Sequence, residues 1–337
     1  MYLSRPAVVL PDAAFDNDAV LSRVRESFRG SASEWDPIEL VIRYVFDRCN
    51  TKLRYLEEDL ALSPGEFASR AATACLRENG LAATDIDLLI YGGIARDAFE
   101  PATAAEVAGR LGARPLHAMD VTCACAGLIE ALHVAAGYFA LHDEIRTALI
   151  CAGELTRDRI RYDFQSFEDV VVGVAGLTLG NAAAAFLISR EPLPAGSARL
   201  VGLQHKTFSE HYTLCSVPVD GHFTSHATEL FALGGVHAPP EIRRLVAAAG
   251  WSTQDVDHYA FHQPSEAALE QVFSELGARP RACVHTHSLF GNTASTSWAV
   301  ALDYRLKHGT VQSGDKIVVA SAASGFTIAG ATAVWDD

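Results

Sequence analysis

The chain has 337 residues, 49% of them hydrophobic and 20% charged, and its formal net charge is −14 at pH 7. This charge argues against nucleic acid and against an anionic membrane surface as partners. The length exceeds that of a typical compact domain, and no long polar linker divides the sequence, so we expect two closely packed halves.

Helix and strand signals alternate along the first part of the chain. A short strand near 7–10 precedes a polar helix, and the pattern of residues 37–60 is that of an amphipathic helix. Ser63 is typical of a helix cap, with Pro64 in the first position, and Gly80 ends the helix. Here the sequence predicts alternating α and β elements.

Buried elements follow. Consecutive apolar residues at 85–92 predict a strand covered on both faces. Residues 101–109 predict a helix, and 112–115 a turn. The stretch 120–140 then combines two cysteines with a helix that is apolar nearly all round. We expect this helix to lie in the core.

The stretch 120–140 places a thiol where a strand passes into a buried helix. Unpaired N–H groups and the helix dipole favour an anion there, so we expect a lowered thiol pKa. Cys123 and Cys125 compete for this position, and a cysteine before an apolar helix is often a small core residue. Because Gly127 marks the helix start, Cys125 lies at the turn and is our candidate nucleophile.

The second half repeats the order of the first. A helix at 241–249 and a strand at 255–262 lead to Leu276–Pro280, which matches Leu111–Pro115 residue for residue. A repeat of about 165 residues predicts two similar halves around a pseudo-twofold axis.

We divide these halves at 1–190, which carries the cysteine, and 191–337. In this alignment Gly291 and Asn292 take the place of Cys125–Gly127, and His262 ends the strand equivalent to 85–92. The tips of equivalent strands would meet at the carboxyl edge of the sheets, where α/β sites form. The repeat therefore brings Cys125, His262 and Asn292 together.

The chemistry of this trio leaves two alternatives open. A cysteine suits thioester exchange, and neutral imidazole and amide groups can donate hydrogen bonds to an enolate or thioester oxygen, as a condensation of two thioesters requires. A cysteine hydrolase would instead use histidine as base and asparagine to orient it. These three residues alone do not distinguish a condensing enzyme from a cysteine hydrolase.

Four motifs carry a family resemblance: Cys125-Ala-Gly with its buried helix, Phe261-His262-Gln263, Gly291-Asn292-Thr293-Ala-Ser, and Ser324-Gly325-Phe326-Thr327. Together they resemble the thiolase superfamily, and within it the β-ketoacyl-ACP synthase III branch. The resemblance implies a five-layer αβαβα thiolase fold, a homodimer and a covalent acyl-Cys125. It also implies that His262 and Asn292 activate the second substrate, and that the backbone N–H groups of Cys125 and Gly325 bind the thioester oxygen.

The resemblance also implies acyl thioester substrates and a narrow tunnel for their pantetheine arm. This sequence differs from the housekeeping synthases of the family in two features. The first 60 residues lack the nucleotide-contacting tryptophan and arginine of housekeeping synthases, which favours delivery by an acyl carrier protein over coenzyme A and a role in secondary metabolism. The segment Phe99-Glu100-Pro101 is similar to branches that join two long acyl chains. There Glu100 would be a base reaching the partner subunit's site, or else a partner of the helix dipole.

Basic residues and histidines remain to be interpreted. Arg157, Arg243 and Arg244 are candidate contacts for a pantetheine phosphate or an acidic carrier protein, or else solvated charges. The histidine-bearing segment 203–235 has no regular metal spacing and is interpreted as an insertion over the acyl pocket.

The ends of the chain and its cysteines indicate the compartment. The first residues lack the features of a signal peptide, no lipidation motif ends the chain, and we expect no membrane span. The seven cysteines show no C-x-x-C or paired His/Cys spacing. We expect a cytoplasmic protein with reduced thiols, no metal and no cofactor beyond the pantetheine carrier of its substrate.

Three functions follow from this sequence. In the first, an acyl thioester acylates Cys125 and a Claisen-type condensation with a second thioester follows. In the second, an acyltransferase of the same fold moves the acyl group to a hydroxyl or amine, with His262 as general base. The third, an inactive partner subunit, is disfavoured by the complete trio.

Overall fold

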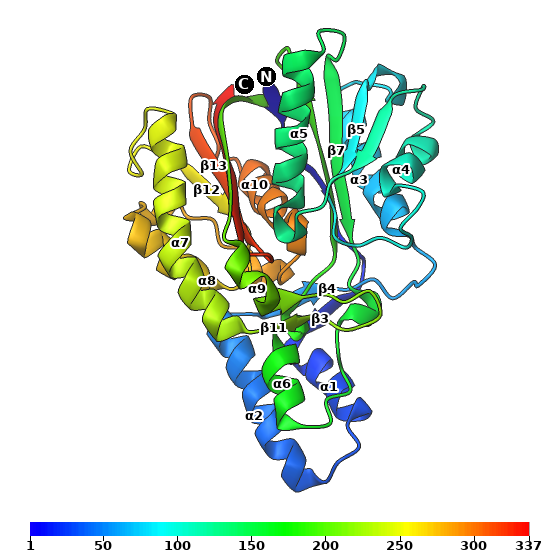
Figure 1. Ribbon diagram of the computed structural model, residues 1–337, viewed down its shortest axis with the longest axis vertical. Helices are drawn as coiled ribbons and strands as arrows, with labels where there is room; N and C mark the ends of the chain where they lie inside the picture. The colour runs from blue at the N-terminus through cyan, green and yellow to red at the C-terminus, as the bar shows by residue number, and fades with distance from the viewer. Residues whose placement is uncertain (337) are drawn as a thin grey trace.

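Two half-sheets with the same pairing pattern form the body of the molecule (Figure 1). The computed structural model describes residues 1–336. The first half-sheet has the order β6-β5-β7-β8, and the second β12-β13-β14-β9. Their bounds are β5 Leu88–Tyr91, β6 His117–Asp120, β7 Thr147–Glu154, β8 Ala182–Ser189, β9 Ser197–Thr207, β12 His258–Phe261, β13 Lys316–Ala323 and β14 Thr327–Asp336.

The pairing directions repeat between the halves. Strand β5 is parallel to β7, as β12 is to β13, and β7 is antiparallel to β8, as β13 is to β14. Strand β1 (Tyr2–Ser4) pairs with both β8 and β9 and so joins the half-sheets, while β2 (Ala7–Val9) pairs with β8. The two halves therefore share one topology around a central seam.

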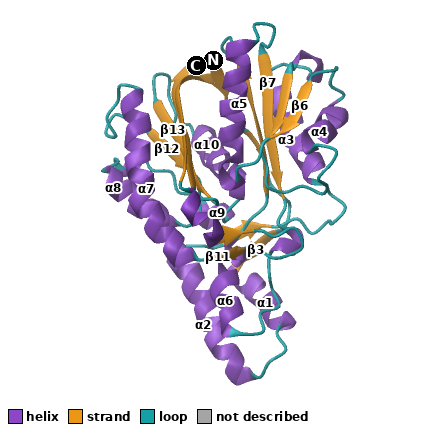
Figure 2. Ribbon diagram, in the orientation of Figure 1, coloured by secondary structure: helices purple, strands orange, loops and turns teal. Residues whose placement is uncertain are grey.

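Helices cover both outer faces and fill the space between the half-sheets (Figure 2). Helices α3 (Pro64–Glu78) and α4 (Thr103–Leu111) pack on the first half-sheet, and α7 (Ala227–Ala248) packs on the second, with α8 (Glu266–Leu276) against it. Helices α5 (Gly127–Leu141) and α10 (Ser297–Lys307) each contact strands of both half-sheets. This is the five-layer αβαβα arrangement that the sequence predicts.

The position of helix α5 in the fold explains why its sequence is so apolar. The segment Ala124–Leu141 is long and apolar enough, by length and composition alone, to cross a membrane. In the structure it packs between the half-sheets, with Leu128, Ile129 and Leu132 fully buried. Its buried residues face sheet strands on two sides, whereas Leu141 at its end is exposed.

Several helix ends agree with the sequence prediction. The Ser63 hydroxyl accepts a hydrogen bond from the Glu66 N–H at 2.9 Å, and Pro64 is the first residue of α3. Helices α4 and α8 both end at a glycine in the left-handed region, with φ 68° at Gly112 and 62° at Gly277. The repeated Leu-Gly-Ala-Arg-Pro motif is thus the same helix stop in both halves.

The helix predicted over 37–60 is confirmed up to Cys49 and wrong beyond it. Helix α2 spans Ala32–Cys49 and ends because Asn50 adopts a left-handed φ of 54°. Beyond it β4 (Leu53–Tyr55) pairs with β3 (Ala14–Asp16). With α1 (Asn17–Ser27) and α6 (Phe167–Gly173), α2 forms the projection at the bottom of Figure 1.

Helix α7 is longer than the predicted 241–249. It begins at Ala227 and includes Pro239 and Pro240, whose missing N–H groups disfavour a helix interior. Burial of Ala238, Pro239 and Ile242 compensates. Before α7, the segment after β9 forms the small hairpin of β10 (Cys215–Ser216) and β11 (Thr224–Ser225).

Candidate active site

Cys125 lies in the single helical turn η2 (Ala124–Ala126) directly before α5. Ala124 has a φ of 45°, so the backbone bends sharply ahead of the cysteine. The Ser321 hydroxyl of β13 donates to the Cys125 carbonyl at 3.0 Å. A Cβ added at Gly127 would collide with the Gly92 carbonyl, which is why a glycine must start α5.

The environment of Cys125 corrects our expectation of a lowered pKa. Burial raises the pKa of this thiol, and the neighbouring groups Cys215, Glu154 and Cys123 raise it further. Residue 125 as a whole is half-buried. Desolvation therefore outweighs the helix dipole, and the resting residue is a protonated thiol.

His262 directly follows β12 and is only 6% exposed. Its backbone N–H donates to the Ala320 carbonyl of β13 at 2.8 Å. Burial lowers the pKa of the imidazole to about 4, opposed by the backbone of Ala294. At neutral pH the ring is therefore uncharged, and among residues 1–336 no group hydrogen bonds to its buried Nδ1 atom.

Asn292 is fixed by its backbone to the first half of the chain. Its N–H donates to the Thr178 carbonyl and its carbonyl accepts from the Gly180 N–H, both at 2.9 Å. The side-chain Oδ1 atom accepts from the Ala294 N–H at 3.0 Å. This contact identifies the oxygen of the amide and leaves the Nδ2 group as a donor for a ligand.

The structure brings these three residues to one place. The Cys125 carbonyl accepts a hydrogen bond from Ser321 of β13, and the His262 N–H donates one to Ala320 of the same strand. Asn292 precedes η7 (Ala294–Thr296), which packs against η2. Their convergence therefore involves both halves of the molecule.

One detail of the predicted symmetry is wrong. Helix α10 starts after η7 as α5 starts after η2, and the bends at Ala294 (φ 52°) and Ala124 (φ 45°) are equivalent. Cys125 thus corresponds to Ser295, and not to Gly291 or Asn292. The equivalent feature in the two halves is the single helical turn that starts the central helix.

Sequence reasoning missed a buried carboxylate at the end of β7. Glu154 is 3% exposed and accepts hydrogen bonds from the N–H groups of Ile94, at 2.9 Å, and Ala95, at 3.2 Å. It also accepts one from the Ser295 hydroxyl. Burial raises the Glu154 pKa and these bonds oppose the rise. A carboxylate directly after the apolar strand 147–153 was the available signal.

Other predicted residues lie around this centre. Gly325, with φ 99°, forms the turn between β13 and β14, and η2 packs against both strands. Glu100 is exposed in the loop between β5 and α4, and its side chain makes no hydrogen bond or ion pair within residues 1–336. The structure of this single chain does not bring Glu100 to Cys125.

The three candidate arginines are engaged with other residues. Arg157 pairs with Asp97 at 2.7 Å and also donates to the Leu62 carbonyl. Arg243 donates to the Glu275 carbonyl, and the exposed Arg244 pairs with Glu241 at 3.0 Å. A carrier protein or pantetheine phosphate would have to compete with these contacts.

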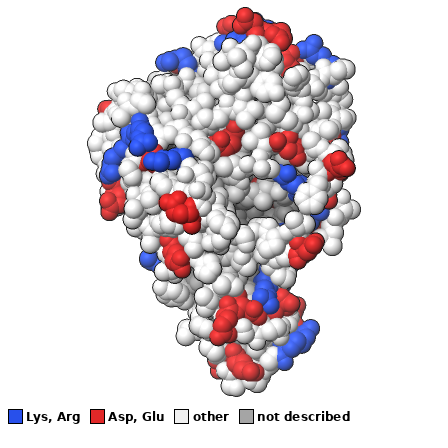
Figure 3. Space-filling view, in the orientation of Figure 1, with Lys and Arg blue, Asp and Glu red and all other residues white. Residues whose placement is uncertain are grey.

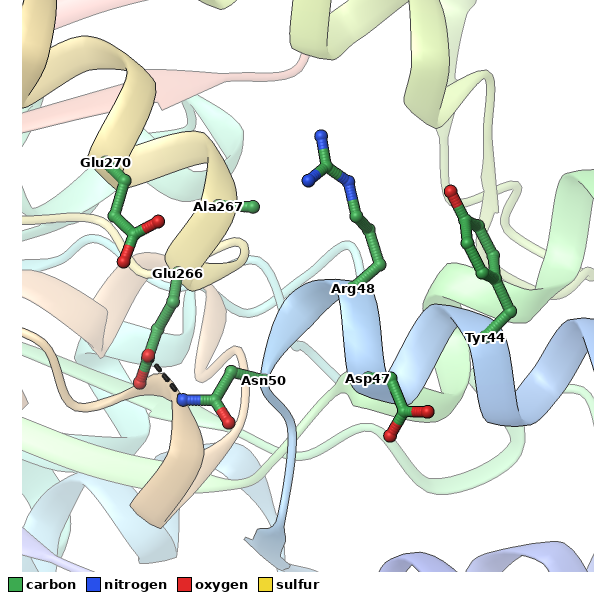
Figure 4. A pocket seen from close by; sticks show the side chains of 7 residues that line it. All are labelled: Tyr44, Asp47, Arg48, Asn50, Glu266, Ala267 and Glu270. Atoms are coloured by element: carbon green, nitrogen blue, oxygen red, sulfur yellow. Dashed lines mark hydrogen bonds between the residues drawn. The ribbon is translucent and has the colours of Figure 1, made fainter.

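Figure 3 shows a hollow in the middle of one face, near the N-terminal end of α5 in this view. A separate cavity of about 500 Å³ opens between α2 and α8, and Figure 4 shows its polar lining. There Asn50 donates to Glu266 at 2.5 Å. None of Cys125, His262 and Asn292 lines this second cavity.

Comparisons with known proteins agree with this architecture. Residues 246–335 match the family model described as 3-oxoacyl-[acyl-carrier-protein (ACP)] synthase III C terminal. The chain is 26% identical to a β-ketoacyl-[acyl-carrier-protein] synthase III of Levilactobacillus brevis, over 78% of this chain and 81% of the relative. It is 28% identical to an acyl-CoA:acyl-CoA alkyltransferase of Xanthomonas campestris pv. campestris, over 84% of this chain and 85% of the relative.

Solved structures share the whole fold. A variant of OleA from Xanthomonas campestris superposes with a TM-score of 0.89 at 23% identity, covering 99% of this chain and 98% of that one. FabH from Pseudomonas aeruginosa superposes with a TM-score of 0.83 at 21% identity, covering 100% and 98%. The chain has the thiolase fold, and its sequence is similar to the β-ketoacyl-ACP synthase III-like condensing enzymes of the thiolase superfamily.

Proposed function

We propose that the chain loads an acyl group from a CoA or carrier-protein thioester onto Cys125 and then performs a Claisen-type condensation with a second acyl thioester. The observation that carries this proposal is the pair formed by a neutral, buried His262 and an Asn292 whose Nδ2 group is left as a donor. Two uncharged donors stabilise an enolate without supplying an acid strong enough to quench it.

The first half-reaction is thioester exchange. The Cys125 sulfur attacks the acyl carbonyl, the bond to the carrier sulfur breaks, and the carrier leaves as a thiol. Because burial keeps the Cys125 thiol protonated, its proton must leave as the carbon–sulfur bond forms. His262, neutral at the end of β12, is the proposed acceptor and passes this proton to the departing carrier sulfur, so that the ring is neutral again. The N–H groups of Cys125 and Gly325 are the proposed donors to the carbonyl oxygen.

In the second half-reaction a carbanion of the second thioester attacks the acyl-Cys125 carbonyl. The new carbon–carbon bond forms, the bond to the Cys125 sulfur breaks, and the thiolate takes a proton from the base that formed the carbanion or, after decarboxylation, from water. His262 and Asn292 hold the thioester oxygen of the attacking substrate. The carbanion arises by decarboxylation or by removal of a proton.

Glu100 is the proposed base if the carbanion arises by proton removal. Its side chain is free in this chain, and β6 ends the sheet order with one unpaired edge. We propose that two copies associate and that Glu100 reaches the partner subunit's site. A variant of OleA, which shares this fold, has been crystallised with bound lauric acid and lauroyl-CoA. This likeness supports long acyl thioesters as substrates here.

Intact-protein mass spectrometry tests the loading step. Incubation with acyl thioesters of different chain length and carrier should add one acyl mass to the native protein and to Cys123→Ala, but not to Cys125→Ala. An adduct on Cys125→Ala would overturn the assignment.

Product analysis tests the second step. The loaded enzyme is given a second acyl thioester, a malonyl thioester, or hydroxyl and amine acceptors. A new carbon–carbon bond supports condensation. Transfer to oxygen or nitrogen alone would instead show the acyltransferase.

A further inference from the structure

A cluster of three ligand-type side chains lies beside the reaction centre without taking part in it. Cys123 precedes η2, Glu130 lies on α5 and His205 lies on β9, and one donor atom of each falls within 4.8 Å of the other two. We propose that Cys123, Glu130 and His205 bind a divalent cation of the zinc class.

The donor set fits such a cation. Thiolate, imidazole and carboxylate are the ligands that zinc binds in proteins, at about 2.0 to 2.3 Å. In a tetrahedral site these ligands stand roughly 3.3 to 3.8 Å from one another, so small side-chain rotations would close the cluster around an ion. A water molecule would complete the coordination.

Hydrogen bonds already orient the histidine. The Nε2 atom of His205 lies 3.1 Å from the Thr207 hydroxyl, which lies 2.8 Å from the Thr327 hydroxyl. This chain of hydroxyls leaves Nδ1 facing the Glu130 carboxylate at 2.5 Å. Such bonds to the outer ring nitrogen are typical of metal-ligating histidines, because they fix the ring and its tautomer.

Charge also favours a cation at this place. In the free protein a hydrogen on the His205 Nδ1 atom accounts for its contact with the Glu130 carboxylate, and a metal ion would take the place of that hydrogen. A dication would displace the thiol proton of Cys123 and balance the charges of one thiolate and one carboxylate.

Solvent can reach the cluster. The His205 side chain is 37% exposed and Glu130 16%. The ring of His133, on the next turn of α5, lies edge-on to that of His205 with centroids 6.3 Å apart. Its Nδ1 is hydrogen bonded to the Ile129 carbonyl at 3.1 Å, and His133 is not one of the three clustered ligands.

The bound ion would join the start of α5 to the second half-sheet. His205 pairs with Ala329 of β14 and so belongs to the second half-sheet. Cys123 lies two positions before Cys125, the proposed nucleophile. Sequence spacing could not reveal it, because the third ligand is 75 residues from the second. This proposal does not depend on the condensation reaction.

Cobalt(II) titration of the metal-depleted full chain tests the site. Thiolate ligation gives a near-ultraviolet charge-transfer band, and tetrahedral geometry gives intense visible bands. Both should form with the native protein and be displaced by zinc. Cys125→Ser should retain both sets of bands. Cys123→Ser should lose the charge-transfer band, and His205→Gln should lose tight cobalt binding. Thr207→Val should weaken binding by roughly tenfold.

Alkylation gives a second measurement that requires no variant. Zinc should slow the reaction of iodoacetamide with Cys123 in the native chain, as followed by peptide mass spectrometry, and leave Cys49 unchanged. The proposal is overturned if cobalt gives no thiolate band, if the band survives in Cys123→Ser, or if zinc leaves Cys123 alkylation unchanged.

Discussion

At the scale of single residues, Asn292 is held so that only one of its two polar groups is free. The Oδ1 atom is occupied by the Ala294 N–H, and the backbone is fixed by Thr178 and Gly180. Whatever Asn292 does for a substrate, it does through Nδ2, by donating a hydrogen bond.

Asn292→Asp should therefore separate donation from loop geometry. The aspartate can still accept from the Ala294 N–H, but it presents an oxygen where Nδ2 was. We expect acyl loading of Cys125 to continue while condensation falls roughly 10²-fold or more, as when an oxyanion donor is lost. Asn292→Ala should behave alike. Mass spectrometry under single-turnover conditions measures acyl loading, and product analysis measures condensation. An equal loss of loading and condensation would contradict the role of Asn292 as a donor to the second substrate.

Glu154 permits a second prediction at this scale. Glu154→Gln should destabilise the fold by about 1 to 3 kcal/mol, because one carboxylate oxygen becomes an NH₂ group facing existing donors in a buried site. Ser295→Ala removes only one hydroxyl donor and should cost about 1 kcal/mol. Urea unfolding of both variants measures the difference. A Glu154→Gln variant as stable as the native protein would show that the carboxylate carries a proton that the amide can replace.

At the scale of elements, the start of α5 depends on close contact between two glycines. A Cβ at Gly127 would meet the Gly92 carbonyl, and one at Gly92 would meet the backbone of Gly127 and Leu128. This contact brings the helix, and with it Cys125, against the end of β5.

Gly127→Ala and Gly137→Ala form a matched pair within α5. We expect Gly127→Ala to destabilise the protein and slow acyl loading, because η2 must move away from β5. At Gly137 an added Cβ meets no atom within 4 Å, so alanine should be neutral or stabilise by about 0.5 to 1 kcal/mol through helix propensity. Thermal unfolding of both variants measures the two changes in stability. Equal changes in Gly127→Ala and Gly137→Ala would contradict the packing argument.

The elements also show what the sequence could predict. Apolar runs, caps and the repeated Leu-Gly-Ala-Arg-Pro stop depend on local physics, and together with the family resemblance they predicted the five layers. The end of α2 and the length of α7 depend on the β3–β4 pairing and on buried contacts, which no local pattern records. Glu154 and the Cys123, Glu130 and His205 cluster became visible only when distant segments met.

At the scale of the whole molecule, the buried site makes stability depend on pH. Burial lowers the pKa of both His262 and His287 to about 4. His287 is fully buried and bonded to the Thr51 hydroxyl at 2.6 Å and the Gln263 carbonyl at 2.9 Å. Both rings are therefore uncharged in the folded protein near neutral pH.

The sign of the effect follows from proton uptake. In the unfolded chain a histidine titrates near pH 6.5, so between pH 6.5 and 4 the unfolded state binds protons that the folded state does not. The native state is most stable above this window and loses stability as pH falls through it. Between pH 7 and 5 each ring should cost roughly 2 kcal/mol of unfolding free energy.

Urea unfolding at pH 7 and pH 5 measures this loss, and His287→Gln should reduce it by roughly the share of one ring. His226→Gln is the control, because the side chain of His226 is 53% exposed and its replacement should leave the pH dependence unchanged. If His287→Gln loses as much stability on acidification as the native protein, the ring is protonated in the folded state. The interior around Gln263 and Thr51 would then hold a charge that its burial argues against.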